Sequence, residues 1–224
     1  MKPIERVKAL LEGKKTDVPA INLWKHFPPY DEDPVQLVKK IAQFQDRFNW
    51  DFVKVTYQGL FSVQDWGSKI KWPERNSEWP ATCSGVGVVT DFSVKRPEDW
   101  ANLRPLSMDE GSMKASIDAA KGAIDRYKGV APVVVTVFNS LTTAVKMSGE
   151  KMFVHMRQNP EAFVKGIRTI TKTTADFVKS VMKAGADGIF FASQLGNFDK
   201  MSVQEYETFG RPYDLEILEH AAGG

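Results

Sequence analysis

The stretch from Ala131 to Phe138 constrains the fold more than any other part of the chain. It reads Ala-Pro-Val-Val-Val-Thr-Val-Phe, an apolar run rich in β-branched residues. A strand that is apolar on both faces has to be covered on both faces, which is the usual situation in a parallel sheet flanked by helices. The run therefore predicts a buried parallel strand.

Helical and strand patterns alternate along the rest of the chain. Asp33 followed by Pro34 is a helix start, and Lys183-Ala-Gly185 is a helix end. Strands are expected at 18–24, 51–56, 131–138 and 187–192, with a short one near 87–90 in a tryptophan-rich excursion. Helices are expected at the N-terminus, from residue 34, and over 113–127, 160–183 and 202–222. Such alternation implies a parallel sheet with right-handed crossovers, either open and doubly wound or closed into a barrel.

The strand expected at 51–56 favours the barrel. Its apolar side chains alternate with hydrogen-bonding ones, Val53, Val55 and Tyr57 against Lys54, Thr56 and Gln58. In a doubly wound sheet both faces read apolar, whereas polar groups toward the carboxyl end of a strand suit the mouth of a barrel. No Gly-x-Gly-x-x-Gly motif follows the first strand. We expect an α/β fold of the (β/α)8 TIM-barrel type, with about five of its strands in residues 1–224.

Composition narrows the classes of partner. The net charge is only +2, from 30 basic and 28 acidic side chains, so neither a nucleic acid nor an anionic membrane is expected as a partner. Cys83 is the single cysteine, so no intrachain disulfide can form. One cysteine and three scattered histidines provide too few ligands, so no metal site is expected in these residues. The charged first helix does not resemble a signal peptide. A cytoplasmic protein is expected.

Several stretches resemble, in order and spacing, the uroporphyrinogen decarboxylase superfamily, which also contains corrinoid-dependent methyltransferases. They are 3–13 followed by Val18-Pro19, Asp51-Phe-Val-Lys-Val, Phe138-Asn-Ser-Leu-Thr-Thr-Ala, Ala184-Gly-Ala-Asp-Gly-Ile-Phe-Phe-Ala-Ser-Gln, and 206–218 with Arg211-Pro-Tyr. The resemblance implies that residues 1–224 are a single partial barrel domain, the N-terminal portion of the family fold. It also implies decarboxylation at the barrel mouth without a cofactor.

The resemblance also points to site residues and to departures from the family pattern. In the decarboxylases a strand aspartate stabilises the cation formed on a pyrrole ring, and basic side chains hold the substrate carboxylates. Here Gln58 falls at the aspartate position, Lys25 and His26 lie where the family has arginines, Lys146 falls near a substrate tyrosine, and Ser193 matches a substrate serine. Gln58 and Lys54 are thus the candidate catalytic residues. The candidate substrate-binding residues are Lys25, His26, Lys146, Ser193 and Gln194.

Three of these residues also have a plain structural interpretation. Lys54 on the inner face must meet a carboxylate or reach into the cleft, because an unpaired buried ammonium is costly. Gln58 could simply bond a loop backbone, as most buried amides do. His26 should point inward near the mouth, as an acid or base or bonded to a nearby carbonyl.

Three functions stay open. The first is a decarboxylase-like carboxy-lyase acting on a carboxylated tetrapyrrole or related small molecule, without a cofactor. The second is a zinc- and corrinoid-dependent methyltransferase, whose zinc ligands would lie beyond Gly224. The third is a non-catalytic or truncated tetrapyrrole-binding barrel. Because an unclosed barrel exposes a strand edge, we also expect a homodimer or another chain that completes it.

Overall fold

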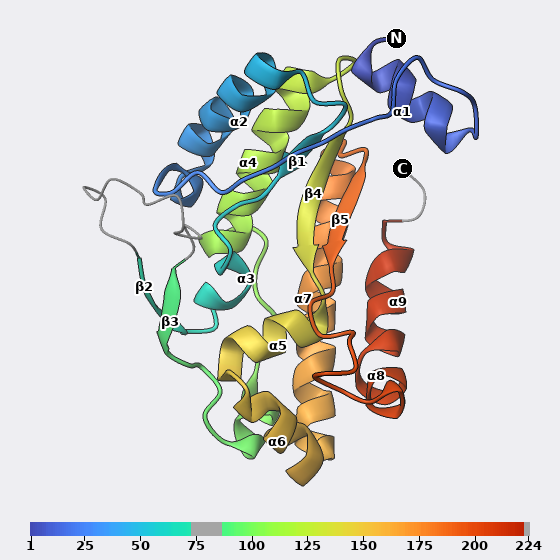
Figure 1. Cartoon of the computed structure of the whole chain (residues 1–224). Coiled ribbons are helices and arrows are strands. Elements are labelled where there is room, and N and C mark those ends of the chain that lie inside the picture. Colours follow the sequence, from blue (N-terminus) through green and yellow to red (C-terminus); the bar gives the residue numbers. More distant parts are fainter. Residues whose placement is uncertain (73–86, 222–224) are drawn as a thin grey trace.

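The computed structural model describes residues 1–72 and 87–221. At its centre is a parallel sheet in the order β1-β4-β5, formed by β1 (Val53–Val55), β4 (Val133–Phe138) and β5 (Gly188–Ala192) (Figure 1). Each neighbouring pair is in parallel register along its length. The predicted parallel strand at 131–138 is therefore the central strand of this sheet.

Helices follow each strand and cover the sheet. Their bounds are α1 (Pro3–Leu11), α2 (Pro34–Phe48), α3 (Phe61–Gln64), α4 (Gly111–Tyr127), α5 (Ser140–Ser148), α6 (Lys151–Gln158), α7 (Pro160–Lys183), α8 (Val203–Phe209) and α9 (Arg211–Glu219), with 3-10 turns at η1 (Tyr30–Glu32) and η2 (Pro97–Asn102). The helices α4 and α7 run along one face of the sheet, and α3 and α5 lie at the carboxyl ends of the strands (Figure 1). The helical regions expected from the sequence are confirmed.

Local signals account for the helix ends. The side chain of Asp33 accepts a hydrogen bond from the backbone N–H of Gln36 at 2.8 Å, and Pro34 fills the first helical position of α2. At the other end of the longest helix, α7, Gly185 has a φ of 102°, which an L-residue with a side chain rarely adopts. These termini keep α2 and α7 within their predicted limits.

Two hydrophobic clusters hold the layers together. The first joins the apolar faces of the strands to α4 and α7, with Val53, Val135 and Val178 among its buried members. The second lies below the carboxyl ends of the strands, around the fully buried Trp100 and Phe163. Trp100 donates its indole N–H to Nδ1 of His155 at 3.2 Å, so this histidine has a structural role.

One strand prediction needs correction. Residues 18–24 form no strand; the segment lies along the edge of β1, where Ile21 and Asp51 exchange two hydrogen bonds, one through the Asp51 side chain. Because a side chain takes the place of a backbone partner, no regular ladder forms. The short strand predicted near 87–90 is confirmed as β3 (Val88–Asp91), which pairs antiparallel with β2 (Lys69–Lys71) in a separate sheet. Trp79 and Cys83 lie outside the described residues.

No helix in the described part of the chain combines the length and the apolar character that crossing a bilayer requires.

Candidate functional site

The carboxyl ends of the three parallel strands bring the predicted site residues to one side of the sheet. Thr56 follows β1, and its hydroxyl lies 2.8 Å from that of Thr136 on β4. These two residues share the polar face with Lys54, opposite the face that packs on the helices. The predicted division of β1 into an apolar and a polar face is correct.

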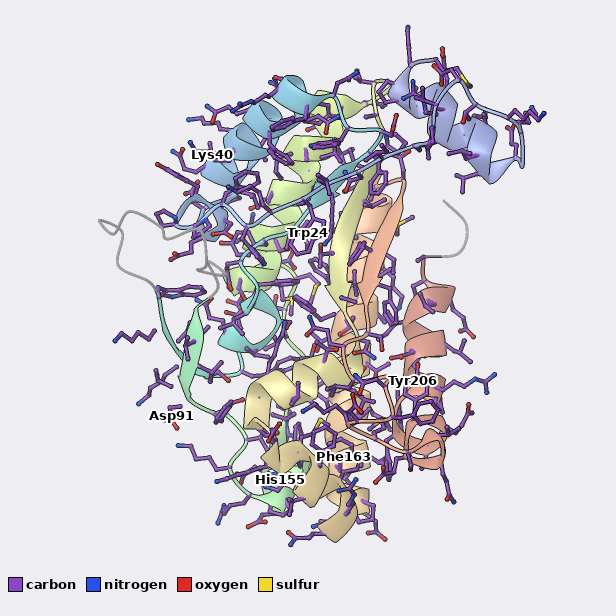
Figure 2. The ribbon with its side chains drawn as sticks, in the orientation of Figure 1. Trp24, Lys40, Asp91, His155, Phe163 and Tyr206 are labelled. Atoms are coloured by element: carbon purple, nitrogen blue, oxygen red, sulfur yellow. The ribbon has the colours of Figure 1, made fainter. Side chains whose placement is uncertain are left out.

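Lys54 lies between two aromatic rings on this polar face. Its Nζ is 3.2 Å from the ring centroid of Trp24 and 3.7 Å from that of Phe190, and the residue is 7% exposed. Trp24 is labelled in Figure 2. Among the described residues no carboxylate forms an ion pair with Lys54, and burial lowers its pKa to about 8. Aromatic faces stabilise the ammonium instead of a carboxylate.

Lys146 on α5 is the second buried amine near the mouth. It donates to the backbone oxygen of Gly59 at 2.9 Å, and its Nζ lies 3.1 Å from the ring centroid of Phe138 at the end of β4. Burial lowers its pKa to about 7. Lys146 thus ties α5 to the turn that follows Gln58.

Gln58 is held by its own loop. Its Nε2 donates to the side-chain oxygen of Gln64 at 2.9 Å, and its Oε1 accepts from the backbone N–H of Leu60 at 2.7 Å. The residue is 3% exposed and borders a cavity of about 220 Å³ that Tyr57 and Asp65 also line. The structural interpretation of Gln58 as a loop-bonding amide is therefore correct, and both ends of the amide are used.

His26 is held by a carboxylate rather than by a carbonyl. Its Nδ1 lies 3.1 Å from Oδ2 of Asp31, which is 2% exposed and also accepts from the backbone N–H of Phe27. The imidazole packs edge-on against Trp24 at a centroid distance of 5.6 Å. Lys25 is exposed, with its Nζ 5.7 Å from the Phe27 ring centroid. His26 therefore belongs to the aromatic group that surrounds Lys54.

Ser193 and Gln194 follow β5 as expected and are both exposed. The backbone N–H of Gln194 donates to the hydroxyl of Thr142 at 3.0 Å, which joins this loop to α5. The Ser193 hydroxyl accepts from the side chain of Asn139 at 3.2 Å. Ser193 also borders a cavity of about 290 Å³ lined by Phe198, Met201, Val203 and other residues of 196–206.

Asn139, Tyr206 and Asp214 were not predicted as site residues, yet they lie directly behind Ser193. Asn139 and Asp214 are 75 residues apart in sequence and are joined by hydrogen bonds of 3.0 and 3.1 Å. Tyr206, labelled in Figure 2, donates to Asp214 at 2.8 Å. An asparagine directly after a buried strand was the one available signal, because a buried amide needs partners.

Within residues 1–72 and 87–221 no three His, Cys, Asp or Glu side chains are grouped in a way that could hold a metal ion. His26 and His155 are engaged with Asp31 and Trp100.

Parallel strands covered by helices, with polar groups collected at the carboxyl ends of the strands, define an α/β scaffold of the barrel class. The chain belongs to the uroporphyrinogen decarboxylase (URO-D) family, whose model matches residues 5–224. Its fold is the TIM-barrel type of that family.

Two relatives are named as methyltransferases. The solved structure of a methyltransferase from Methanosarcina mazei superposes with a TM-score of 0.81 at 16% identity, covering 99% of this chain and 68% of that chain. The Methylcobamide:CoM methyltransferase MtbA of Methanosarcina acetivorans is 21% identical over 131 residues, which are 58% of this chain. The match covers 39% of that relative, so the chain spans about two fifths of its length.

Proposed function

We propose that the chain forms part of a methyltransferase of the URO-D superfamily that takes a methyl group from a methylated corrinoid. The observation that carries this proposal is Gln58, a neutral amide whose two ends are both bonded within the loop after β1. The methylcobamide in the name of the Methanosarcina acetivorans relative supports the choice of methyl donor.

Gln58 matters because the two reactions differ in where charge develops. Decarboxylation of a pyrrole substrate passes through a protonated ring, and a fixed carboxylate lowers that barrier. Gln58 is neutral, and its oxygen already accepts from Leu60, so it offers no negative charge to such a ring. When a methyl group moves from a corrinoid to a nucleophile, the new bond to carbon forms as the old one breaks, and the electron pair of the old bond stays with the donor. No pyrrole carbon becomes cationic.

The remaining polar groups of the mouth act in binding. Lys54 lies between the exposed rings of Trp24 and Phe190, so these three side chains present an aromatic surface with one buried amine. A planar macrocycle can stack on such rings while its peripheral oxygens accept from the amine. His26, Lys25, Ser193 and Gln194 extend this binding surface, and Lys146 holds the turn beside it.

Zinc is the metal that the methyltransferase branch implies. The described residues do not fit it, because they provide no group of three ligands. The roles proposed for this chain are therefore limited to binding and orienting the corrinoid.

A second candidate is decarboxylation of a carboxylated tetrapyrrole, and the amines of Lys54 and Lys146 favour it. Neither Lys54 nor Lys146 has a carboxylate partner among the described residues. A substrate carboxylate would supply the missing counter-charge. The neutral side chain of Gln58 disfavours decarboxylation, but it does not disfavour binding of the same substrate.

The test is a methyl transfer assay with the full-length protein, methylcobalamin as donor and coenzyme M as acceptor. We expect the absorbance of methylcobalamin to change with time and the S-methylated thiol to be found by mass spectrometry, only when protein and thiol are both present. Lys54→Met should raise the KM for methylcobalamin about tenfold through the loss of a buried charged donor. Lys121→Met, at an exposed site on α4, is the matched control and should leave the KM unchanged.

Two other outcomes would redirect the assignment. Loss of carboxyl groups from uroporphyrinogen without methyl transfer would establish the decarboxylase. Binding of either macrocycle without turnover would support the non-catalytic alternative.

A further inference from the structure

Asn139 is the centre of a polar cluster buried behind the mouth of the barrel. It is fully buried, and it is the N-cap of α5, where its Oδ1 accepts from the backbone N–H of Thr142 at 2.9 Å. Its Nδ2 donates to both carboxylate oxygens of Asp214 and to the hydroxyl of Ser193. Its backbone N–H donates to the oxygen of Ala192 at 3.2 Å. One side chain therefore links the ends of β4 and β5 to α9.

The orientation of this amide is fixed from both ends. A backbone N–H can only donate, so the atom of Asn139 that faces Thr142 must be the oxygen. The two carboxylate oxygens of Asp214 accept, so the atom that faces them must be the nitrogen. A flipped amide would lose the bonds at both ends.

The fixed amide determines the role of Ser193. Because Nδ2 of Asn139 has no acceptor capacity, the Ser193 oxygen accepts this bond and its own proton points elsewhere. That hydroxyl forms no other hydrogen bond to the described residues and borders the cavity of about 290 Å³. Ser193 therefore offers one donor to whatever enters the cavity.

Asp214 and Tyr206 hold Asn139 in place. Asp214 is 4% exposed, and among the described residues it forms no ion pair with a basic side chain, so its hydrogen bonds come from Asn139 and Tyr206. The Tyr206 ring passes close to Gly210, where a Cβ would lie 2.6 Å from ring atom Cε2. Gly210 thus allows the tyrosine to reach Asp214 across the junction of α8 and α9.

We propose that Asn139, Asp214 and Tyr206 are positioning residues that make Ser193 a hydrogen-bond donor to a carbonyl or carboxylate oxygen on the substrate. The cavity lining is mainly apolar, with Phe198, Met201 and Val203, so the group it takes has an apolar stem and a terminal acceptor. The proposal rests on the proposed function to the extent that the substrate is a macrocycle with such side groups. Amide carbonyls would come from a corrinoid, and carboxylates from a tetrapyrrole acid.

The experiment is a double-mutant cycle on binding by the full-length protein. Equilibrium binding of methylcobalamin, which carries amides, and of uroporphyrin, which carries carboxylates, is measured by tryptophan fluorescence quenching. We expect Ser193→Ala and Tyr206→Phe each to weaken binding of one macrocycle about fivefold to tenfold, the effect of one hydrogen bond. The double variant should bind no more weakly than Ser193→Ala alone, because Tyr206 acts through Ser193.

The matched control is Tyr213→Phe on α9, whose hydroxyl forms no hydrogen bond to another described residue, and it should bind as the parent does. Should Tyr206→Phe fail to fold, Asp214→Asn replaces it in the cycle. In the methyl transfer assay Tyr206→Phe should raise KM and leave kcat unchanged, which general destabilisation would not produce.

The outcomes separate this proposal from the proposed function. Independent, multiplying effects of Ser193→Ala and Tyr206→Phe, or no effect of Tyr206→Phe, would overturn the positioning role even if methyl transfer is observed. If Ser193→Ala and Tyr206→Phe weaken uroporphyrin binding non-additively and no methyl transfer is observed, the positioning role is upheld and the methyltransferase is rejected. Failure of the parent protein to bind either macrocycle would reject both.

Discussion

Because of Lys146, the free energy of unfolding should rise with pH. A lysine in a salt bridge, whose pKa is raised, has the opposite effect. Burial lowers the pKa of Lys146 from 10.5 to about 7 in the folded chain. Between these values the unfolded chain holds a proton on this amine that the folded chain has released, so the free energy of unfolding rises with pH. For this one group, linkage gives an increase of about 2 kcal/mol from about pH 7 to about pH 9.

Urea unfolding followed by tryptophan fluorescence at several pH values measures this increase. We expect Lys146→Met, which keeps the apolar stem and removes the amine, to reduce the rise in unfolding free energy by about 2 kcal/mol. Lys121→Met, at an exposed site on α4, is the matched control and should keep the parent's pH dependence. Equal slopes for the parent and Lys146→Met would refute the claim that the amine is buried as its contacts with Gly59 and Phe138 indicate.

Three further predictions follow from single contacts. Gly210→Ala should lower the free energy of unfolding by about 1–3 kcal/mol in urea titrations, because its Cβ would meet the Tyr206 ring; an unchanged value would contradict this packing. Burial lowers the pKa of His155, so the melting temperature should fall as the pH drops below about 6.5, and His155→Gln should flatten that fall. Gln58→Asp supplies the negative charge that decarboxylation needs, so chromatography of uroporphyrinogen products should show more decarboxylation than with the parent; equal product yields would contradict the weight given to the neutral Gln58.

The helices and the central strand could be predicted because their signals are local. The Asp33 cap, the proline at position 34 and the apolar run ending at Phe138 each determine an element from a few neighbouring residues. The segment 18–24 could not be predicted in the same way. Its apolar pattern suits a strand, but the side chain of Asp51 replaces the backbone partner that a ladder needs. The pairing of β3 with β2 also depends on contacts outside the local sequence.

In the candidate site, too, local sequence signals predict where a residue lies but not which distant residues it contacts. The inward direction of Lys54 follows from strand alternation, and the position of Ser193 follows from the family resemblance. The partners of these residues are non-local: Phe190 beside Lys54 and Asp214 behind Ser193 come from distant parts of the chain. Association with another copy of the chain stays a prediction, which size-exclusion chromatography of the full-length protein would test.

One incubation would test the central claim most directly. The full-length protein is given methylcobalamin, coenzyme M and uroporphyrinogen together, and the products are analysed by mass spectrometry. Because Gln58 is neutral, we expect the thiol to be S-methylated and the uroporphyrinogen to remain intact. Decarboxylated porphyrinogen with no methylated thiol would contradict it.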